Sequence, residues 1–345
     1  MGLSDLRQVV EAFQLRIADL PELLTGLLQQ VPAGKVTTYG DLAKALGDSV
    51  ASRWVATWLL EADCPLGELS HRVVRSTGDI GLYFSGDVQQ KIARLQAEGI
   101  EVTESKVNLK QHRFALTKGS MPLLELKGWQ TNFVCRARPP VMLGDIRTIA
   151  GLDVSYAGNQ GIAVCSRFDV DGKTLISHAS ICRPVSFPYI TGYLAFRELP
   201  LHLELLATMQ EEGTLPDLLL VDGNGRLHPR RLGIATMLGA LAGIPTIGIA
   251  KKRICGTIAN DLPEVGVWEP IAASQTEPND LLGYAILPHA KTKHPQYVSL
   301  GYGVDDHLMK TMVTRCFAGH RSPEPIHAAD RESRRIASTI IATGA

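Results

Sequence analysis

The chain has 345 residues, of which 45% are hydrophobic and 20% are charged, and its 35 Lys and Arg residues balance 35 Asp and Glu residues. This composition is that of a globular protein and excludes a disordered chain. It also argues against a polycation that binds nucleic acid through its overall charge. A chain of this length is large for one hydrophobic core, so we expect two domains.

The zero net charge conceals an uneven distribution along the chain. Residues 1–104 contain 9 Lys and Arg against 14 Asp and Glu, residues 105–150 contain 8 against 2, and residues 151–345 contain 18 against 19. The basic middle segment is typical of a joint that contacts phosphate. The six cysteines lack CxxC spacing, no apolar run reaches the ~18 residues of a membrane span, and the start does not resemble a signal peptide. We therefore expect a cytoplasmic protein with reduced thiols and no membrane partner.

Helical patterns dominate the first hundred residues. An amphipathic helix is expected to end at Val31, a short helix with a Thr cap and a Gly stop is predicted over Thr38–Gly47, and a second one over Ser49–Leu60. Two helices around a glycine-containing turn follow the plan of a helix-turn-helix. Residues 105–121 mix Lys, Gln, Gly and Ser and are predicted to form a linker.

The pattern changes to strands after residue 148. Three strands joined by hairpin turns are predicted first, and alternating helices and strands follow. The predicted strands are Thr148–Val154, Gly161–Phe168, Leu175–Cys182, Asp217–Asp222 and Thr246–Ala250, and the predicted helices are Ala195–Gln210 and Arg231–Ala242. This succession predicts a mixed α/β sheet.

Three acidic residues in the second half of the sequence lie within or next to predicted strands and helices. Asp153 lies inside an apolar strand, Asp222 ends another, and Glu198 comes early in a helix. A buried carboxylate is costly unless it is paired or binds a cation, and two on neighbouring strands repel each other. For any one of them a turn-forming role is the simpler explanation. Together the three indicate a site for a hard cation such as Mg²⁺ or Mn²⁺.

The residues around Asp222 strengthen this interpretation. The segment Val221–Arg230 contains two glycines that let the backbone approach a ligand closely, and His228 can transfer a proton. It resembles the central motif of endonuclease V, and the other motifs of that family occur in the correct order. They are similar to Ile149–Tyr156, Phe187–Glu198, Ile244–Lys251, Tyr297–Ser299 and Arg321–Pro325.

This resemblance covers roughly residues 122–336. It implies a ribonuclease H-like fold and a Mg²⁺-dependent deoxyribonuclease that nicks the second phosphodiester 3′ to deaminated bases, chiefly hypoxanthine (inosine). It also implies that Asp153, Glu198 and Asp222 hold Mg²⁺, with Mn²⁺ as a substitute, and that His228 and Lys251 act at the scissile phosphate. The implied strand-separating wedge consists of Pro188, Tyr189, Ile190 and Thr191, and the implied base pocket of Gly192, Leu194, Gly223, Gly225, Gly248 and Ile254.

The chain departs from the family pattern at several positions. Thr191 stands where the wedge has a proline, and Leu300-Gly301-Tyr302 stands where a carboxyl-terminal motif has Pro-Gly-His. Asp330 occupies a late acidic or histidine position and is compatible with metal-linked chemistry. Tyr189 is explained equally well as a core aromatic residue.

A second resemblance covers about residues 20–104. Val31–Ala43, Ser70–Val74, Gly78–Tyr83 and Ala97–Gly99 resemble the DNA-binding domain of O6-alkylguanine-DNA alkyltransferases, a mostly helical winged helix-turn-helix. Those enzymes accept the alkyl group on the Cys of a Pro-Cys-His-Arg motif, whose Cys is replaced here by Ser70. A hydroxyl is a far weaker nucleophile than a thiolate toward an alkyl carbon, so we expect no alkyltransferase activity.

The first domain therefore looks like an alkyltransferase-like protein, which binds O6-alkylguanine in DNA without repairing it. The resemblance implies that the lesion lies near Ser70, that Tyr39 rotates the nucleotide out and that Arg53 fills the vacated stack. A solvated helix face is the alternative explanation for Arg53.

The sequence thus predicts an α/β protein with an alkyltransferase-like domain (residues 1–104), a basic linker (105–121) and an endonuclease V domain (122–345). We expect a monomer that binds damaged DNA and nicks it beside deaminated purines. Two alternatives remain: an inosine-specific endoribonuclease that acts on RNA, and a non-catalytic lesion-binding scaffold. The intact carboxylates argue against the scaffold.

Overall fold

The computed structural model describes residues 5–61, 66–117, 119–133 and 140–343. The chain divides into two compact units. The first unit consists of Met1–Arg16, Gln130–Ser186 and Leu194–Ala345, and the second consists of Ile17–Trp129 and Phe187–Tyr193. Each unit therefore contains a short segment that the sequence-based boundaries assign to the other.

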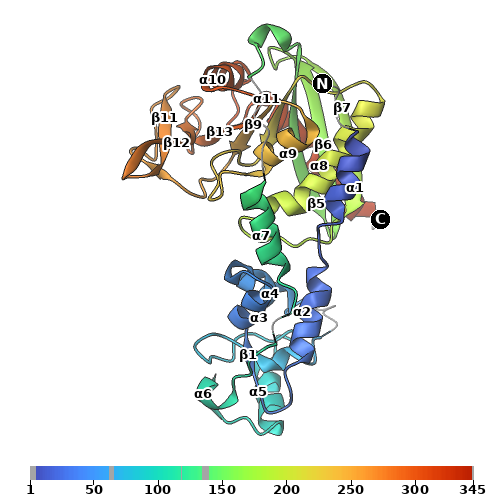
Figure 1. Ribbon diagram of the computed structural model, residues 1–345, viewed down its shortest axis with the longest axis vertical. Coiled ribbons are helices and arrows are strands. Elements are labelled where there is room, and N and C mark those ends of the chain that lie inside the picture. The colour runs from blue at the N-terminus through green and yellow to red at the C-terminus, as the bar shows by residue number, and fades with distance from the viewer. Residues whose placement is uncertain (1–4, 62–65, 118, 134–139, 344–345) are drawn as a thin grey trace. The chain divides into compact units, whose positions relative to one another are not determined.

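Among the described residues, nine strands form one sheet in the first unit (Figure 1). Strands β5, β6 and β7 form two antiparallel hairpins, whereas β8 and β9 run parallel to β5. The order across the sheet is β10-β11-β12-β13-β9-β8-β5-β6-β7. The strands are β5 (Thr148–Ala157), β6 (Gln160–Asp169), β7 (Leu175–Pro184), β8 (Leu218–Asp222), β9 (Thr246–Ala250), β10 (Thr257–Ile258), β11 (Trp268–Ser274), β12 (Glu277–Ile286) and β13 (Gln296–Tyr302). The predicted mixed α/β sheet is confirmed.

Helices cover both faces of the sheet in the first unit. Successive residues of β5 point to opposite faces: a Cβ on Gly151 would lie 2.1 Å from the carbonyl of Pro325 in α11, whereas the Tyr156 hydroxyl reaches Glu198 in α8. Helices α11 and α8 therefore lie on opposite sides of β5. The helices of this unit are α1 (Leu6–Gln14), α8 (Leu194–Glu211), α9 (Ile234–Ala242), α10 (Asp306–Arg315) and α11 (Glu324–Thr343).

The second unit is mostly helical, with two pairs of very short strands. Thr38 caps the helix that follows it, because its Oγ1 accepts a hydrogen bond from the Asp41 amide at 3.0 Å. Its helices are α2 (Leu20–Gln29), α3 (Tyr39–Ala45), α4 (Ser52–Trp58), α5 (Val88–Ala97), α6 (Leu109–His112) and α7 (Pro122–Asn132), and its strands are β1 (Thr37–Thr38), β2 (Val73–Val74), β3 (Val102–Thr103) and β4 (Lys106–Val107). Helix α7 extends past Trp129, where the first unit resumes.

The segment predicted to be a linker is part of this unit instead. It contains β4 and α6, and the Val36 amide donates to the His112 carbonyl at 2.9 Å while the Phe114 amide donates back to Val36 at 2.8 Å. Val107 is buried against the core. The polar composition of residues 105–121 misled the prediction, because a few apolar side chains are enough to hold so short a segment.

Two helix starts also differ from the prediction. The second helix of the helix-turn-helix begins with a 3₁₀ turn over Ser49–Ala51, capped by Asp48, and α4 follows from Ser52. Helix α9 begins at Ile234 rather than at Arg231, because Arg231 has a φ of 58° and cannot continue a right-handed helix. Within the part of the chain that the structure describes, no helix is both long and apolar enough to span a membrane.

Candidate functional site

The sheet brings two of the predicted carboxylates together. Strands β5 and β8 are parallel neighbours, and Leu152 pairs with Val221, so the next residues, Asp153 and Asp222, lie side by side. Helix α11 adds Asp330. Of the described residues, Asp153, Asp222 and Asp330 form a group whose ligand oxygens all lie within 4.8 Å of one another. Carboxylate oxygens at this spacing are suited to a hard divalent cation.

Lys251 lies at the end of β9 and neutralises part of this charge. Its Nζ donates to Asp222 Oδ2 at 2.7 Å and to Asp330 Oδ1 at 3.1 Å. Burial lowers the pKa of Lys251, but the charges and hydrogen bonds of these two carboxylates outweigh burial and raise it. Arg321 donates to the Lys251 carbonyl at 2.6 Å and thereby fixes the backbone that carries the lysine.

Asp153 is the most deeply placed of the three aspartates. It is 6% exposed, and burial together with the Asp222 charge raises its pKa. Ser333, one turn after Asp330 in α11, donates to Asp153 Oδ2 at 2.7 Å. Sequence analysis missed Ser333: its i+3 spacing places it on the same helix face as Asp330, but nothing in the local sequence indicates that this face meets Asp153.

Glu198 is predicted to be a metal ligand but is not part of the group of three aspartates. Its Oε1 accepts a hydrogen bond from the Tyr156 hydroxyl at 2.9 Å. Burial raises the pKa of Glu198 to about 8, and the charges of Asp222 and Asp153 also raise it. The hydrogen bond from Tyr156 lowers this pKa but does not outweigh them. Glu198 therefore shares the electrostatic environment of the aspartates, and Asp330 has a more direct place among them than the sequence indicated.

His228 and the arginines beside it follow the glycine-rich turn after β8. His228 is 6% exposed, and its Nδ1 accepts a hydrogen bond from the Arg230 amide at 3.2 Å. When the ring is neutral, a proton on Nε2 is the tautomer that agrees with this contact. Arg230 donates to Gln130 at 2.7 Å, and Arg231 forms an ion pair with Asp280.

The glycines of the predicted base pocket have a local packing explanation. A Cβ on Gly223 would lie 2.3 Å from Ile234, one on Gly225 would lie 2.2 Å from the Leu300 carbonyl, and one on Gly248 would lie 2.3 Å from the Gly225 amide. Close approach of the chain to itself thus accounts for these three residues. Their backbone as the lining of a base pocket stays a prediction.

The remaining pocket and wedge residues are divided between the units. Leu194 and Ile254 belong to the first unit, and Ile254 is 42% exposed. The predicted wedge and Gly192 belong to the second unit. Tyr189 is 66% exposed, so it is not the core aromatic residue of the alternative explanation.

The second unit contains the residues predicted to contact an alkylated base. Arg53 is exposed on α4, Tyr39 begins α3 half-buried, and Ser70 is buried. The Ser70 hydroxyl donates to the Gly67 carbonyl at 2.7 Å, so its proton is engaged by the backbone.

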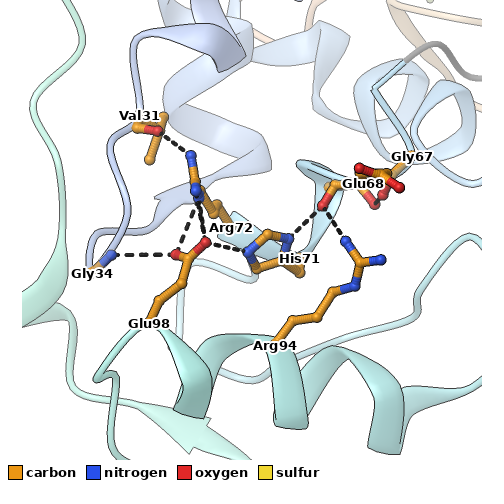
Figure 2. Close-up of polar contacts among 9 residues, drawn as sticks. Val31, Gly34, Gly67, Glu68, His71, Arg72, Arg94 and Glu98 are labelled. Atoms are coloured by element: carbon orange, nitrogen blue, oxygen red, sulfur yellow. Dashed lines mark hydrogen bonds and ion pairs between the residues drawn. The ribbon is translucent and has the colours of Figure 1, made fainter.

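His71 and Glu98 belong to a polar network in the second unit (Figure 2). His71 Nε2 lies 2.8 Å from Glu98 Oε1, and its Nδ1 lies 2.5 Å from the Glu68 carbonyl. Arg72 and the Gly34 amide also donate to the Glu98 carboxylate. Although burial opposes it, these contacts lower the pKa of Glu98. Both ring nitrogens of His71 thus face oxygen atoms of other residues rather than the Ser70 hydroxyl.

Comparisons with known proteins agree with this geometry. The family model described as Endonuclease V matches residues 134–331, and the model described as 6-O-methylguanine DNA methyltransferase, DNA binding domain, matches residues 22–100. A protein of Picrophilus torridus, named Bifunctional methyltransferase/endonuclease, is 38% identical over 247 residues, which are 70% of this chain and 78% of the relative.

Solved structures of endonuclease V also resemble this chain. The catalytic domain of human Endonuclease V has a TM-score of 0.56 and 28% identity, and the match covers 63% of this chain and 96% of that chain. Endonuclease V of Ciona intestinalis, in complex with a 23mer DNA containing an inosine followed by a ribo-adenosine, has a TM-score of 0.55 and 25% identity over 63% of this chain and 98% of that chain. These neighbours and the strand order confirm the predicted ribonuclease H-like fold.

Proposed function

Because the chain belongs to the endonuclease V family, we propose that it is a metal-dependent DNA repair endonuclease that nicks the second phosphodiester 3′ to a deaminated base, chiefly inosine. The observation that carries the proposal is the convergence of Asp153, Asp222 and Asp330 with Lys251, where β8 and β9 end beside the middle of β5. The inosine in the DNA bound by the Ciona relative supports this class of substrate.

The donor set fits a hard divalent cation. Burial raises the pKa values of Asp153 and Glu198, and the charges of the neighbouring carboxylates act in the same direction, so a divalent cation would relieve this repulsion. Asp153, Asp222, Asp330 and Glu198 are the residues that would hold Mg²⁺, with Mn²⁺ as a substitute. When bound, such an ion activates water and neutralises charge on the phosphate.

The residues of the chain contribute positioning and charge. Lys251, held by Asp222 and Asp330, presents an ammonium group to a phosphate oxygen. The protonated Nε2 of His228 is suited to donate to the phosphate or the leaving oxygen. The exposed Tyr189 is suited to fill the gap that a flipped base leaves in the duplex.

A nicking assay tests this function directly. Duplexes that carry inosine, uracil or O6-methylguanine are incubated with the chain and Mg²⁺, and we expect a nick beside inosine. Asp222→Asn is expected to abolish nicking while it preserves binding to the same duplex, because it removes one charge from the aspartate group without changing the fold. Retained nicking by Asp222→Asn would refute the assignment of the metal site.

We further propose that the second unit binds O6-alkylguanine without transferring the alkyl group. The match to the transferase DNA-binding domain, the serine at position 70 and the engaged ring of His71 support this role. The chain is expected to bind an O6-methylguanine duplex more tightly than an undamaged duplex, and Arg53→Ala is expected to reduce this preference. Equal affinities of the wild-type chain for both duplexes would refute the role.

Cleavage of RNA is the second candidate. The DNA bound by the Ciona relative carries a ribonucleotide directly after the inosine, which favours it. Rates on inosine-containing DNA and RNA of equal sequence decide between the two substrates. A faster rate on RNA would make the chain an inosine-specific endoribonuclease.

A further inference from the structure

The predicted wedge is anchored in the unit that contains the helix-turn-helix. Phe187–Tyr193 lies within a stretch that matches the Endonuclease V model, yet it packs with Ile17–Trp129 as one compact unit. Phe187, Ile190 and Tyr193 are each at most 3% exposed, whereas Tyr189 is 66% exposed. The segment therefore has three buried anchors that hold Tyr189 outward.

One of these anchors is polar and specific. The Tyr193 hydroxyl lies 2.8 Å from Asp48 Oδ2 and 3.2 Å from the Leu123 carbonyl. A phenol has one proton to donate, and the charged, closer carboxylate is the stronger acceptor. The bond to Asp48 is thus the main polar contact of this anchor.

Asp48 has a second role in the same unit. Its Oδ1 accepts a hydrogen bond from the Val50 amide at 3.1 Å and caps the 3₁₀ turn that leads into α4, the helix of Arg53. Lys127 Nζ lies 3.6 Å from Oδ2. Although burial opposes it, the contacts with Val50, Tyr193 and Lys127 lower the pKa of Asp48, so the carboxylate is ionised. A single carboxylate therefore joins the start of the Arg53 helix to the anchor of the wedge segment.

We propose that Asp48 and Tyr193 are positioning residues that hold the wedge Pro188–Thr191 on the lesion-binding unit, so that this unit sets where Tyr189 enters the duplex. The inference rests on the proposed function and deepens it, because it names residues outside the nuclease sheet that control opening of the base pair. It also supplies a physical link between the two predicted activities. Lesion recognition and strand opening then share one rigid contact.

The test uses the full chain and substrates that differ in their need for strand opening. Tyr193→Phe keeps the buried ring and removes the hydroxyl. We expect its kcat/KM on inosine in a fully paired duplex to fall about tenfold, the usual effect of losing a hydrogen bond to a charged group. On inosine in a single strand, where no base pair must be opened, the rate should stay within about twofold of wild type.

Three further variants make the result specific. Tyr83→Phe is the matched control, because Tyr83 is also a buried tyrosine of this unit and its hydroxyl has no hydrogen-bond partner among the described residues; it should leave both rates unchanged. Asp48→Asn can still bond the Tyr193 hydroxyl and should retain the wild-type ratio of rates. Asp48→Ala should lower the ratio, and combining it with Tyr193→Phe should add little.

The outcomes separate the inference from the proposed function. A wild-type chain that nicks neither inosine substrate would refute the proposed function. If the wild-type chain nicks both, equal losses on both substrates in Tyr193→Phe, or no loss on either, would overturn the inference alone. A loss confined to the paired substrate, absent in Tyr83→Phe, would establish it.

Discussion

The residues around position 70 affect transferase activity as much as the replacement of cysteine by serine does. His71 Nδ1 faces the Glu68 carbonyl and Nε2 faces Glu98, so both ring nitrogens are directed at groups other than the side chain at position 70. We therefore expect Ser70→Cys to remain inactive as a transferase, because no ring nitrogen of His71 is directed at the thiol to help form the thiolate. Intact-protein mass after incubation with O6-methylguanine DNA checks this. Gain of one methyl group per chain would contradict it.

A buried histidine in α8 gives the chain a pH-dependent stability. His202 is 1% exposed, its Nδ1 has no hydrogen-bond partner among the described residues, and burial lowers its pKa to about 4. Below its ordinary pKa of ~6.5 the unfolded chain takes up a proton that the folded chain does not, so stability falls as pH decreases from about 6.5 to 4. At about pH 5 this amounts to roughly 2 kcal/mol relative to pH 7.

Substitution of this histidine tests the effect. In urea unfolding at pH 7 and at about pH 5, His202→Leu should lose less stability on acidification than wild type, by about 2 kcal/mol. His307→Leu, an exposed position on α10, is the control and should keep the wild-type difference. An unchanged pH dependence in His202→Leu would show that another group dominates.

Among the elements, α1 is the one whose place in the fold the sequence concealed. It packs on α8 within the first unit, where the Phe13 and Phe196 rings stack at 6.1 Å and Arg7 pairs with Glu211 at 2.8 Å. Phe13 is 3% exposed, so Phe13→Ala should lower the free energy of unfolding of this unit by about 3 kcal/mol. Arg7→Ala removes an exposed ion pair and should cost much less stability than Phe13→Ala. Urea unfolding measures both, and equal small losses would mean that α1 is not part of the folded unit.

The elements that the sequence predicted well are those with strong local patterns. In the sequence, β5 is an apolar run that contains Asp153, and β8 is an apolar run that ends in Asp222. The parallel pairing of these two strands brings the two aspartates together. The direct contact of Ser333 with Asp153 could not be predicted, because it depends on how α11 packs on the sheet. The assignment of Phe187–Tyr193 to the second unit likewise depends on tertiary contacts, which no local pattern records.

For the whole molecule, each unit contains a short segment from the other part of the sequence, Met1–Arg16 in the first unit and Phe187–Tyr193 in the second. A simple truncation therefore cannot separate the two predicted activities. The chain passes between the units after Arg16, Trp129, Ser186 and Tyr193. Deletion of residues 1–104 would remove α1 from the first unit and the partners of Phe187–Tyr193 from the second. Loss of nicking after such a deletion would therefore not report lesion sensing, and point substitutions at Asp48 and Tyr193 are the cleaner probes.

The charge of the whole molecule leads to the last prediction. The net charge is zero, and many arginines are neutralised within their own unit. Among the described residues, the ion pairs of arginines are Arg7–Glu211, Arg72–Glu98, Arg113–Asp41, Arg183–Glu204, Arg226–Asp280, Arg231–Asp280, Arg253–Asp261, Arg334–Asp330 and Arg335–Glu332. Of the basic joint, Lys118, Arg136 and Arg138 lie outside the described residues.

Because the chain has no net charge and these arginines are paired with carboxylates, we expect binding to undamaged DNA to release few counterions. For an undamaged duplex we expect the slope of log Kobs against log salt to be about −3 or shallower, which is less than roughly a 60-fold loss of affinity between about 50 and 200 mM. Fluorescence anisotropy over that range measures the slope. A slope near about −8 would show that bulk electrostatic attraction, rather than lesion geometry, brings this chain to DNA.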